Sequence, residues 1–326
     1  MSSTAVIIPY FQRERGKLAA AIRSVLNQEN AGPITIVVCD DESPVPVDDE
    51  LDLLATEERD RVILVRQKNA GPAAARNAAM DAMPTGINWI AFLDSDDRWS
   101  PDHIARSVAA LQQGYDLCFA DALREPEETT HFQNAGFVPS QHQPITTLQN
   151  LFALSEDFLT LNIRMSPVSI STVVMRADAL GDLRFARMPF EDLMYWFEAA
   201  RHGAKIAFDS SLQVHYSRGN ITVTDHWISQ ASLRNTLCYH RIFMHVAREF
   251  SLTPEQRTIL EQRIAANRLL FSRIALGFLY HAQWPNKRMI MDFLSLDPRG
   301  IRALLGTLAT EMTRRLPFFR RYARNG

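Results

Sequence analysis

Short apolar runs alternate with amphipathic stretches through the first third of the chain, which predicts strands joined by helices. The expected strands are Thr4–Ile8, ended by Pro9, and then Ile34–Cys39, Val62–Val65, Ile87–Leu93 and Leu117–Ala120. The expected helices are 18–26, Ala73–Ala82 and Pro101–Gly114. This β–α–β repetition is typical of an α/β fold in which helices cover both faces of a mostly parallel sheet.

The later part of the chain carries a different pattern. From about Pro126 to Pro167 the periodicity loosens and predicts no defined element. A strand, a helix and two short strands are then expected at Ser169–Val174, Phe190–Arg201, Lys205–Phe208 and Val214–Tyr216. After Thr224 only helices are expected, at His226–Phe250, Pro254–Ala282 and Gly300–Arg315. We therefore predict an α/β domain at 1–223 and a helical C-terminal region at 224–326.

Composition excludes several classes of protein. A net charge of -2 over 326 residues argues against a general nucleic-acid binder. The three cysteines form no Cys-x-x-Cys pair, which suits a reducing compartment and predicts neither a disulfide framework nor a thiolate metal site. No signal-peptide pattern and no run of the ~20 apolar residues that span a bilayer is present. We expect a cytoplasmic protein whose membrane contact, if any, is peripheral at the inner face of the cell membrane.

The acidic run Asp94-Ser95-Asp96-Asp97 directly follows a predicted buried strand. Carboxylates this close repel one another and lose hydration unless a cation or a set of donors compensates them. The carboxyl ends of parallel strands are also where open α/β sheets bind ligands. The run therefore indicates a divalent metal beside a nucleotide diphosphate. The alternative is that it caps the helix near Pro101, for which one Asp is enough.

Polar clusters also follow the first three predicted strands, at Pro9–Arg13, Asp40–Ser43, and Asn69–Pro72 with Arg76. Each has an alternative interpretation as a turn, a helix start or, for Arg76, a solvated helix residue. In a doubly wound sheet, however, all of these clusters open on one edge together with the acidic run. Their coincidence predicts a ligand site.

Glu191 and Asp192 open a predicted amphipathic helix. Acidic residues in a first helical turn stabilise the helix dipole by ~0.3–1 kcal/mol, which is a sufficient structural reason for them. The functional interpretation makes one of them a general base, provided that burial or a neighbouring charge raises its pKa. The sequence pattern leaves both interpretations open.

Five motifs in this order resemble the family 2 inverting glycosyltransferases of the GT-A fold: AVIIPYFQR, CDDESP, NAGPAAARN, FLDSDD and FEDL. The resemblance covers about residues 4–223. More narrowly, the segments PYFQRE and DDESPVP resemble the exopolysaccharide glucosyltransferases of succinoglycan-type assembly. The resemblance implies a UDP-sugar donor, most simply UDP-glucose, and a saccharide acceptor in exopolysaccharide or other cell-surface glycan assembly.

The resemblance also implies residue roles. Asp40 and the backbone near Pro9 would hold the uracil, with Arg76 beside the base. Asp94 would contact the ribose, and Asp96 would coordinate Mn²⁺ or Mg²⁺ at the diphosphate. The donor-binding set would be completed by Tyr10, Phe11, Arg13, Asp41, Asn69 and Ser95. Arg218 would add a cationic contact to the diphosphate, unless it belongs to a plain surface turn.

The implied chemistry is a single displacement. Asp192 would take the proton from an acceptor hydroxyl, and Glu191 would lie near the acceptor or the donor sugar. A fixed cation would offset the charge that develops on the departing diphosphate. Processive relatives carry Gln-x-x-Arg-Trp after the base, whereas here Gln230 and Arg234 are four apart and Asn235 follows. We therefore expect one sugar to be added per acceptor.

The last predicted helix is apolar along one stripe that includes Ile301, Leu305 and Leu308, and arginines flank and follow it. Basic amphipathic segments of this kind often lie on anionic bilayers. A polyprenyl-diphosphate-linked acceptor would make such contact useful, which is an argument from the resemblance. The alternative is a helix packed on the catalytic domain or on a second subunit, as in a homodimer.

Two other functions remain as alternatives. A nucleotidyltransferase would release pyrophosphate, but the glycine- and arginine-containing loop that such enzymes use after the first strand is missing from the sequence. A non-catalytic UDP-sugar-binding subunit of a polysaccharide assembly complex would bind UDP without turnover.

Overall fold

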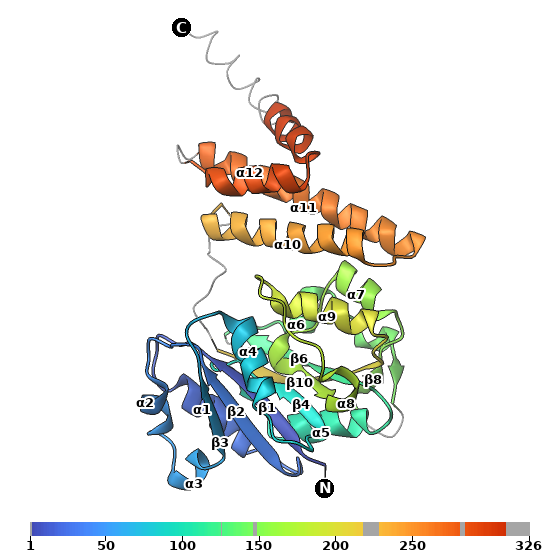
Figure 1. Ribbon diagram of the computed structural model, residues 1–326. Coiled ribbons are helices and arrows are strands. Elements are labelled where there is room, and N and C mark those ends of the chain that lie inside the picture. Colours follow the sequence, from blue (N-terminus) through green and yellow to red (C-terminus); the bar gives the residue numbers. More distant parts are fainter. Residues whose placement is uncertain (1, 125, 146–148, 218–227, 281–283, 311–326) are drawn as a thin grey trace. The chain divides into compact units, whose positions relative to one another are not determined.

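The computed structural model describes all residues except 1, 125, 146–148, 218–227, 281–283 and 311–326. The chain divides into two compact units, Met1–Gly219 and Asn220–Gly326. Figure 1 shows a twisted sheet with helices in the first unit and helices in the second. Each unit is described by itself below.

The first half of the sheet is parallel, as the sequence predicts. Its strands are β1 (Thr4–Tyr10), β2 (Ile34–Asp40), β3 (Val62–Arg66) and β4 (Trp89–Phe92), in the order β3-β2-β1-β4. β1 lies between β2 and β4 and pairs in parallel with both. Within β1, Ala5 and Ile7 face the core on one side of the sheet, and Val6, Ile8 and Tyr10 face the core on the other, as expected for a strand covered on both faces.

The second half of the sheet adds antiparallel strands. β9 (Val174–Arg176) runs antiparallel between β4 and β6 (Leu117–Arg124), and β6 pairs in parallel with β10 (Ile206–Tyr216). β8 (Leu151–Ala153) and β7 (Gln143–Pro144) continue the edge, and β5 (Arg98–Trp99) pairs with β10. The predicted α/β class with a mostly parallel sheet is confirmed, with β5, β7, β8 and β9 as antiparallel additions.

Helices cover both faces of the sheet and bury one apolar core on each side. α1 (Lys17–Leu26) and α5 (His103–Leu111) pack on one face, and α4 (Pro72–Asp81) and α9 (Glu191–Arg201) on the other. The remaining helices of this unit are short: α2 (Val47–Leu51), α3 (Thr56–Arg59), α6 (His131–Ala135), α7 (Phe158–Arg164), α8 (Ala177–Leu180), η1 (Pro139–Gln141) and η2 (Ile170–Thr172). The segment that gave no prediction, 126–167, therefore contains α6, η1, β7, β8 and α7.

Four predicted strands differ from the structure for identifiable reasons. β1 continues past Pro9 to Tyr10, because β4 pairs with β1 only as far as Ile7 and the missing N–H of Pro9 interrupts no pairing there. The strand expected at Ser169–Val174 begins as the 3₁₀ turn η2, where hydroxyl groups bond locally and to the acidic run. The two short strands expected at 205–216 form one continuous strand, β10, whose polar middle forms a bulge.

Two helix boundaries also differ from the prediction. α5 begins at His103 and not at Pro101, and its N-cap is Asp102. Phe190 stands before α9 as its N-cap, in the left-handed backbone region with φ 58°. Few residues other than glycine adopt this conformation, so the chain enters α9 through a sharp and sterically costly turn.

The described part of the second unit contains helices and no strand. α10 (Gln230–Glu249) and α11 (Pro254–Tyr280) match predicted helices, and α12 (Lys287–Leu296) was not predicted. Residues 300–310 are also helical. Leu233, Phe271 and Phe293 are fully buried in the core of this unit. Among the described residues, no helix is both long and apolar enough to cross a membrane.

Candidate functional site

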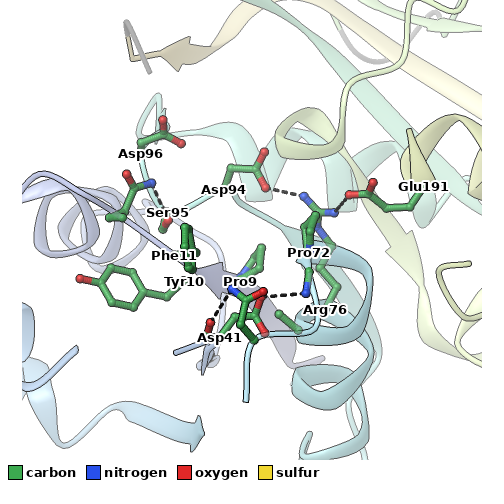
Figure 2. Close-up of a pocket in the computed structure, with 14 residues that line it drawn as sticks. Pro9, Tyr10, Phe11, Asp41, Pro72, Arg76, Asp94, Ser95, Asp96 and Glu191 are labelled. Carbon is green, nitrogen blue, oxygen red and sulfur yellow. Dashed lines mark hydrogen bonds and ion pairs between the residues drawn. The ribbon is translucent and has the colours of Figure 1, made fainter. Parts of the chain in front are cut away.

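The polar clusters that follow the first four strands meet in one cleft of about 540 Å³. We call it the donor cleft, after the ligand that the resemblance implies. Figure 2 shows its walls: the end of β1, the segments after β2, β3 and β4, α4, and the first residue of α9. The strand-end argument predicted this convergence. The residues that line the cleft are Pro9, Tyr10, Phe11, Gln12, Asp41, Asn69, Gly71, Pro72, Ala75, Arg76, Asp94, Ser95, Asp96 and Glu191.

Most of the predicted site residues line this cleft. Arg13, Asp40 and Asp192 are not among its lining residues, and Arg218 lies outside the described residues. Gln12 was not predicted as a ligand-binding side chain, although it lies within the first of the five motifs. Its amide donates to the Ser95 hydroxyl at 3.0 Å, and this contact between two separate clusters left no signal in the sequence.

The carboxylate of Asp41 shapes the loop between β3 and α4. Its two oxygens accept hydrogen bonds from the backbone N–H groups of Ala70 and Gly71 at 2.8 and 2.9 Å, and one also accepts from the Gln67 amide. Gly71 has φ 88°, a conformation that glycine adopts without steric cost. Pro72 then begins α4, where its missing N–H is not needed. Asp41 therefore fixes a wall of the cleft.

Asp40 and Arg13 are engaged at the edge of the cleft. The Asp40 carboxylate accepts from the backbone N–H of Ser43 at 3.0 Å, which is the turn contact of the alternative interpretation. The Arg13 guanidinium lies 5.9 Å from the centre of the Phe11 ring, and Phe11 is 41% exposed. The predicted contact of Asp40 with uracil stays a prediction.

Arg76 is the cation at the centre of the donor cleft. Its guanidinium donates to Glu191 Oε1 and to Asp94 Oδ1, each at 2.6 Å, and its side chain is only 5% exposed (Figure 2). Burial alone would lower the pKa of Arg76, but Asp94 and Glu191 outweigh it and the pKa is raised. The solvated-helix interpretation of Arg76 is therefore wrong. Arg76 joins the acidic run to the start of α9.

The acidic run is held by hydroxyl and backbone donors from two other segments. The Ser171 hydroxyl donates to Asp97 Oδ2 at 2.6 Å and accepts from the backbone N–H of Asp94. Ser217, which follows β10, contacts Asp97 through its N–H and Asp96 through its hydroxyl, at 3.4 and 3.3 Å. None of these side chains caps α5, so the capping interpretation is wrong.

Negative charge is concentrated at this end of the sheet. Burial raises the pKa of Asp96, and the neighbouring Asp94 raises it further. Burial also raises the pKa of Asp97, to which Asp94 and Asp96 add. Within the described residues, no arginine or lysine forms an ion pair with Asp96, and no three His, Cys, Asp or Glu side chains converge on a common point as a preformed metal site.

This donor set still suits a hard divalent cation. Asp96 presents a half-buried carboxylate that lines the cleft and, within the described residues, forms no ion pair with an arginine or lysine. Carboxylate oxygens are the ligands that Mg²⁺ and Mn²⁺ prefer, and Mg²⁺ is commonly held by one or two carboxylates with phosphate oxygens completing its shell. The residues therefore fit a cation that binds together with a diphosphate.

Glu191 and Asp192 face different surroundings although they are adjacent. Glu191 is bound to Arg76 and lines the cleft. Asp192 is half-buried, and its carboxylate accepts from the backbone N–H of Leu193 at 2.8 Å. Burial raises the pKa of Asp192 to about 6, with a further contribution from Glu191 and an opposing one from Arg76. A carboxylate with this pKa can accept a proton near neutral pH.

Two relatives share parts of this chain. The succinoglycan biosynthesis protein ExoW of Rhizobium meliloti is 45% identical over 111 residues, which is 34% of each chain. The chain therefore matches only about a third of the length of that relative. The Escherichia coli protein WfaP, a UDP-Glc:alpha-D-GlcNAc-diphosphoundecaprenol beta-1,3-glucosyltransferase, is 23% identical over 60% of this chain and 70% of its own.

Solved structures of glycosyltransferases share the fold. Staphylococcus aureus TarS 1-349 in complex with UDP-GlcNAc superposes with a TM-score of 0.62, at 15% identity, over 93% of this chain and 82% of that chain. The mannosyltransferase PcManGT from Pyrobaculum calidifontis, in complex with GDP-Man and Mn²⁺, gives a TM-score of 0.57 at 16% identity, over 96% and 80%.

The model of the family named glycosyl transferase family 2 matches residues 5–181, more than half of the chain. This range holds all of the strand-end clusters, from the end of β1 to the acidic run after β4, and reaches α8. The chain therefore belongs to glycosyl transferase family 2.

Proposed function

We propose that this glycosyltransferase is metal-dependent and inverting, and moves one sugar from a UDP-sugar to a saccharide acceptor. Glucose from UDP-glucose is the proposed donor. The observation that carries the proposal is the single cleft in which Asp96, Arg76 and Glu191 meet, with Asp192 beside it. The names of two relatives support the substrate class, since WfaP is a UDP-Glc-dependent glucosyltransferase and ExoW belongs to succinoglycan biosynthesis.

The donor would lie along the carboxyl ends of β1, β2 and β4. A cleft of about 540 Å³ is within the range of ligand pockets, ~300–1,000 Å³. We assign the uracil to Asp40 and the backbone at Pro9, the ribose to Asp94 and the diphosphate to the neighbourhood of Asp96. Arg76 would keep Asp94 and Glu191 in place while it lies beside the nucleotide. The complex of TarS with UDP-GlcNAc supports a donor of this chemical class.

Asp96 would hold Mn²⁺ or Mg²⁺, and such a cation supplies charge neutralisation at the departing diphosphate. The other steps belong to the chain itself. Asp192 would accept the proton of the attacking acceptor hydroxyl, and its pKa of about 6 leaves it mostly ionised at pH 7. Glu191, held by Arg76, would position the sugar. A single displacement inverts the anomeric centre and needs no enzyme nucleophile.

The acceptor would be a growing saccharide of an exopolysaccharide or another cell-surface glycan. A polyprenyl-diphosphate-linked form is supported by the acceptor of WfaP, alpha-D-GlcNAc-diphosphoundecaprenol. We also propose a peripheral contact with the cytoplasmic face of the membrane through the last helix. In its described part Ile301, Leu305 and Leu308 are 49%, 61% and 43% exposed, and the arginine-rich end of that segment lies outside the described residues.

The experiment measures transfer or slow hydrolysis of a panel of UDP- and GDP-sugars with Mn²⁺, Mg²⁺ or EDTA. We expect UDP-glucose to be preferred, EDTA to abolish the reaction, and NMR of the product to show an inverted anomeric centre. Full activity in Asp96→Ala or Asp192→Asn would contradict the proposal. UDP binding without turnover under any of these conditions would instead favour the non-catalytic subunit.

A further inference from the structure

A second cavity, of about 220 Å³, opens at the carboxyl end of β6. We call it the His131 cavity. It shares no lining residue with the donor cleft, and its walls come from β6, the segment 127–134 and the last residue of β10. The residues that line it are Ala122, Arg124, Glu127, Thr129, His131, Asn134 and Tyr216. The sequence analysis predicted no element in most of this region.

Two buried polar atoms of this cavity lack a hydrogen-bond partner among the described residues, His131 Nε2 and Tyr216 Oη. The Ser169 hydroxyl lies near Tyr216 and the Pro167 backbone lies near His131, and each affects the pKa of its neighbour, but neither reaches His131 Nε2 or Tyr216 Oη with hydrogen-bond geometry. The two rings meet edge to face with their centres 6.4 Å apart. Buried polar groups are almost always paired in folded proteins, so unpaired atoms on two residues that line one cavity are candidates to bond a guest in it.

Both of these side chains are uncharged near neutral pH. Burial lowers the pKa of His131, and Asp121 opposes this only in part. Burial raises the pKa of Tyr216, and the negative charges of Asp97 and Asp94 raise it further. A neutral imidazole and a neutral phenol donate and accept single hydrogen bonds, which suits hydroxyl groups better than an ion.

The rest of the wall is also polar and of mixed charge. The Thr129 hydroxyl donates to the Asn134 amide oxygen at 2.8 Å, and the Asn134 amide nitrogen lies 3.5 Å from Glu127. The Arg124 guanidinium lies 5.8 Å from the centre of the Tyr216 ring. A carboxylate in the wall disfavours an anionic guest. The space, about 220 Å³, is less than half that of the donor cleft and suits one sugar ring.

The cavity is fixed by the fold and lies next to the acidic run. One carboxylate oxygen of Asp121, which is buried, accepts from the backbone N–H of Ala122 and of Phe132, and so ties the end of β6 to α6. On the other side, Tyr216 is followed directly by Ser217, whose contacts with Asp96 and Asp97 are described above. Tyr216 therefore lines the cavity, and the next residue, Ser217, contacts Asp96, the proposed metal ligand.

We propose that the His131 cavity binds one monosaccharide ring of the acceptor. The unpaired atoms of His131 and Tyr216 would bond to ring hydroxyls, and Asn134 would add a planar amide. This inference deepens the proposed function and rests on it for the role of the sugar as acceptor. It assigns the acceptor site to the part of the chain that follows β6.

The test follows the imidazole of His131 by NMR in the full chain labelled at histidine, with the His131→Gln variant used to assign its signal. The probes are methyl β-D-glucopyranoside and methyl N-acetyl-β-D-glucosaminide, and cyclohexanol serves as a ring without the array of hydroxyls. We expect a saturable shift of the His131 signal with at least one glycoside and none with cyclohexanol. The absence of a saturable shift with both glycosides would overturn the inference.

Matched variants then locate the sugar. We expect Asn134→Ala and Tyr216→Phe each to weaken glycoside binding about fivefold, as for the loss of one neutral hydrogen bond. Gln141→Ala removes an exposed amide outside the cavity and should leave the affinity unchanged. Unchanged affinity in both cavity variants, with their fold confirmed by thermal melting, would overturn the inference.

Calorimetry with UDP and Mn²⁺ separates this inference from the proposed function. UDP binding and sugar turnover without any glycoside effect at His131 would overturn the inference alone. Glycoside binding at His131 without UDP binding would support the cavity as a sugar site and contradict the proposed function. Where both succeed, a KM for the glycoside acceptor that is about fivefold higher in Tyr216→Phe would support the acceptor role.

Discussion

Each of the two units buries an arginine–carboxylate network, and the networks differ in their balance of charge. In the helical unit the Asp297 carboxylate is 1% exposed and is contacted by Arg268, by Arg299 and by His240 Nε2, at 2.6, 3.2 and 3.2 Å. Burial alone would raise the pKa of Asp297, but the two arginines outweigh it and the pKa is lowered. Two cations here meet one carboxylate.

In the α/β unit the balance is reversed. Arg76 is paired with both Asp94 and Glu191, and Asp192 and Asp96 lie close by without an arginine or lysine partner within the described residues. The pKa values of both of these unpaired carboxyl groups are raised. One cation therefore faces a surplus of negative charge, and this surplus opens into a cleft.

This difference in charge balance distinguishes a structural network from a binding site. Buried charges that are matched within the chain hold helices together and need no ligand. A surplus of buried negative charge costs stability and is retained where a bound cation, a substrate or a transferred proton compensates it. The same residue types thus stabilise one unit and prepare the other for chemistry.

The largest expected effect is on catalysis. Asp192→Asn removes the proposed base and one negative charge, so kcat should fall by about 10²–10⁴. Because the lost charge belongs to the surplus, the midpoint of thermal unfolding should stay the same or rise. Steady-state transfer assays and calorimetric melting measure the two quantities. Asp182→Asn, at an exposed turn, is the matched control and should change neither. A loss of stability that accounts for the lost activity would contradict the role of base.

Removing Arg76 should cost the most stability. In Arg76→Met, Glu191 would remain as a largely buried carboxylate without a cation and Asp94 as a partly exposed one, and loss of one partner of a buried ion pair costs ~3–5 kcal/mol. The free energy of unfolding from urea titration measures this loss. Addition of Mn²⁺ with UDP should restore part of it, because the ligands bind the folded state. A loss below ~1 kcal/mol would show that the carboxylates become protonated or reach water.

Arg268→Met is the matched change in the helical unit, and it should cost less, about 1–3 kcal/mol, because Arg299 and His240 still contact Asp297. Mn²⁺ with UDP should not restore the loss, since this network has no surplus charge for a cation to compensate. Urea titration with and without these ligands measures both points. Recovery as large as that in Arg76→Met would remove the distinction between the two networks.

The sequence predicted the location of the donor cleft better than its internal contacts. Strand ends can be found from local apolar runs, and the geometry of a parallel sheet then brings Pro9, Asp41 and Asp94 to one edge. The pairing of Arg76 with Glu191 joins residues 115 positions apart, and no local pattern encodes it. Asp41 lines the cleft and the adjacent Asp40 does not. This difference depends on the turn after β2, which no local pattern encodes either.

The segment 126–167, for which no element was predicted, does not carry the hydrophobic periodicity that marked the strands and helices elsewhere. Its elements are of only two to seven residues, too short for a hydrophobic period to emerge. Asp121 holds the start of α6 by accepting a hydrogen bond from the backbone N–H of Phe132, a contact that depends on the tertiary fold. The His131 cavity could therefore be found only from the structure, whereas the donor cleft could be located from the chain.

The smallest expected effect concerns pH and tests the charge surplus directly. Since Asp192 must be ionised to accept a proton and its pKa is about 6, kcat/KM should rise about tenfold per pH unit below pH 6 and level off above it. Glu191→Gln removes a neighbouring negative charge, so the inflection should move to lower pH.

Because the pKa of Asp192 is raised in the folded state, its contribution to stability is present at low pH and is lost as pH rises through about 6. Asp192→Asn should therefore flatten the decline of unfolding free energy between about pH 4 and 6. If the inflection of the kcat/KM profile stays at the same pH in Glu191→Gln, the charge of Glu191 does not affect the pKa of Asp192. The contrast with the charge-matched network around Asp297 would then lose its physical basis.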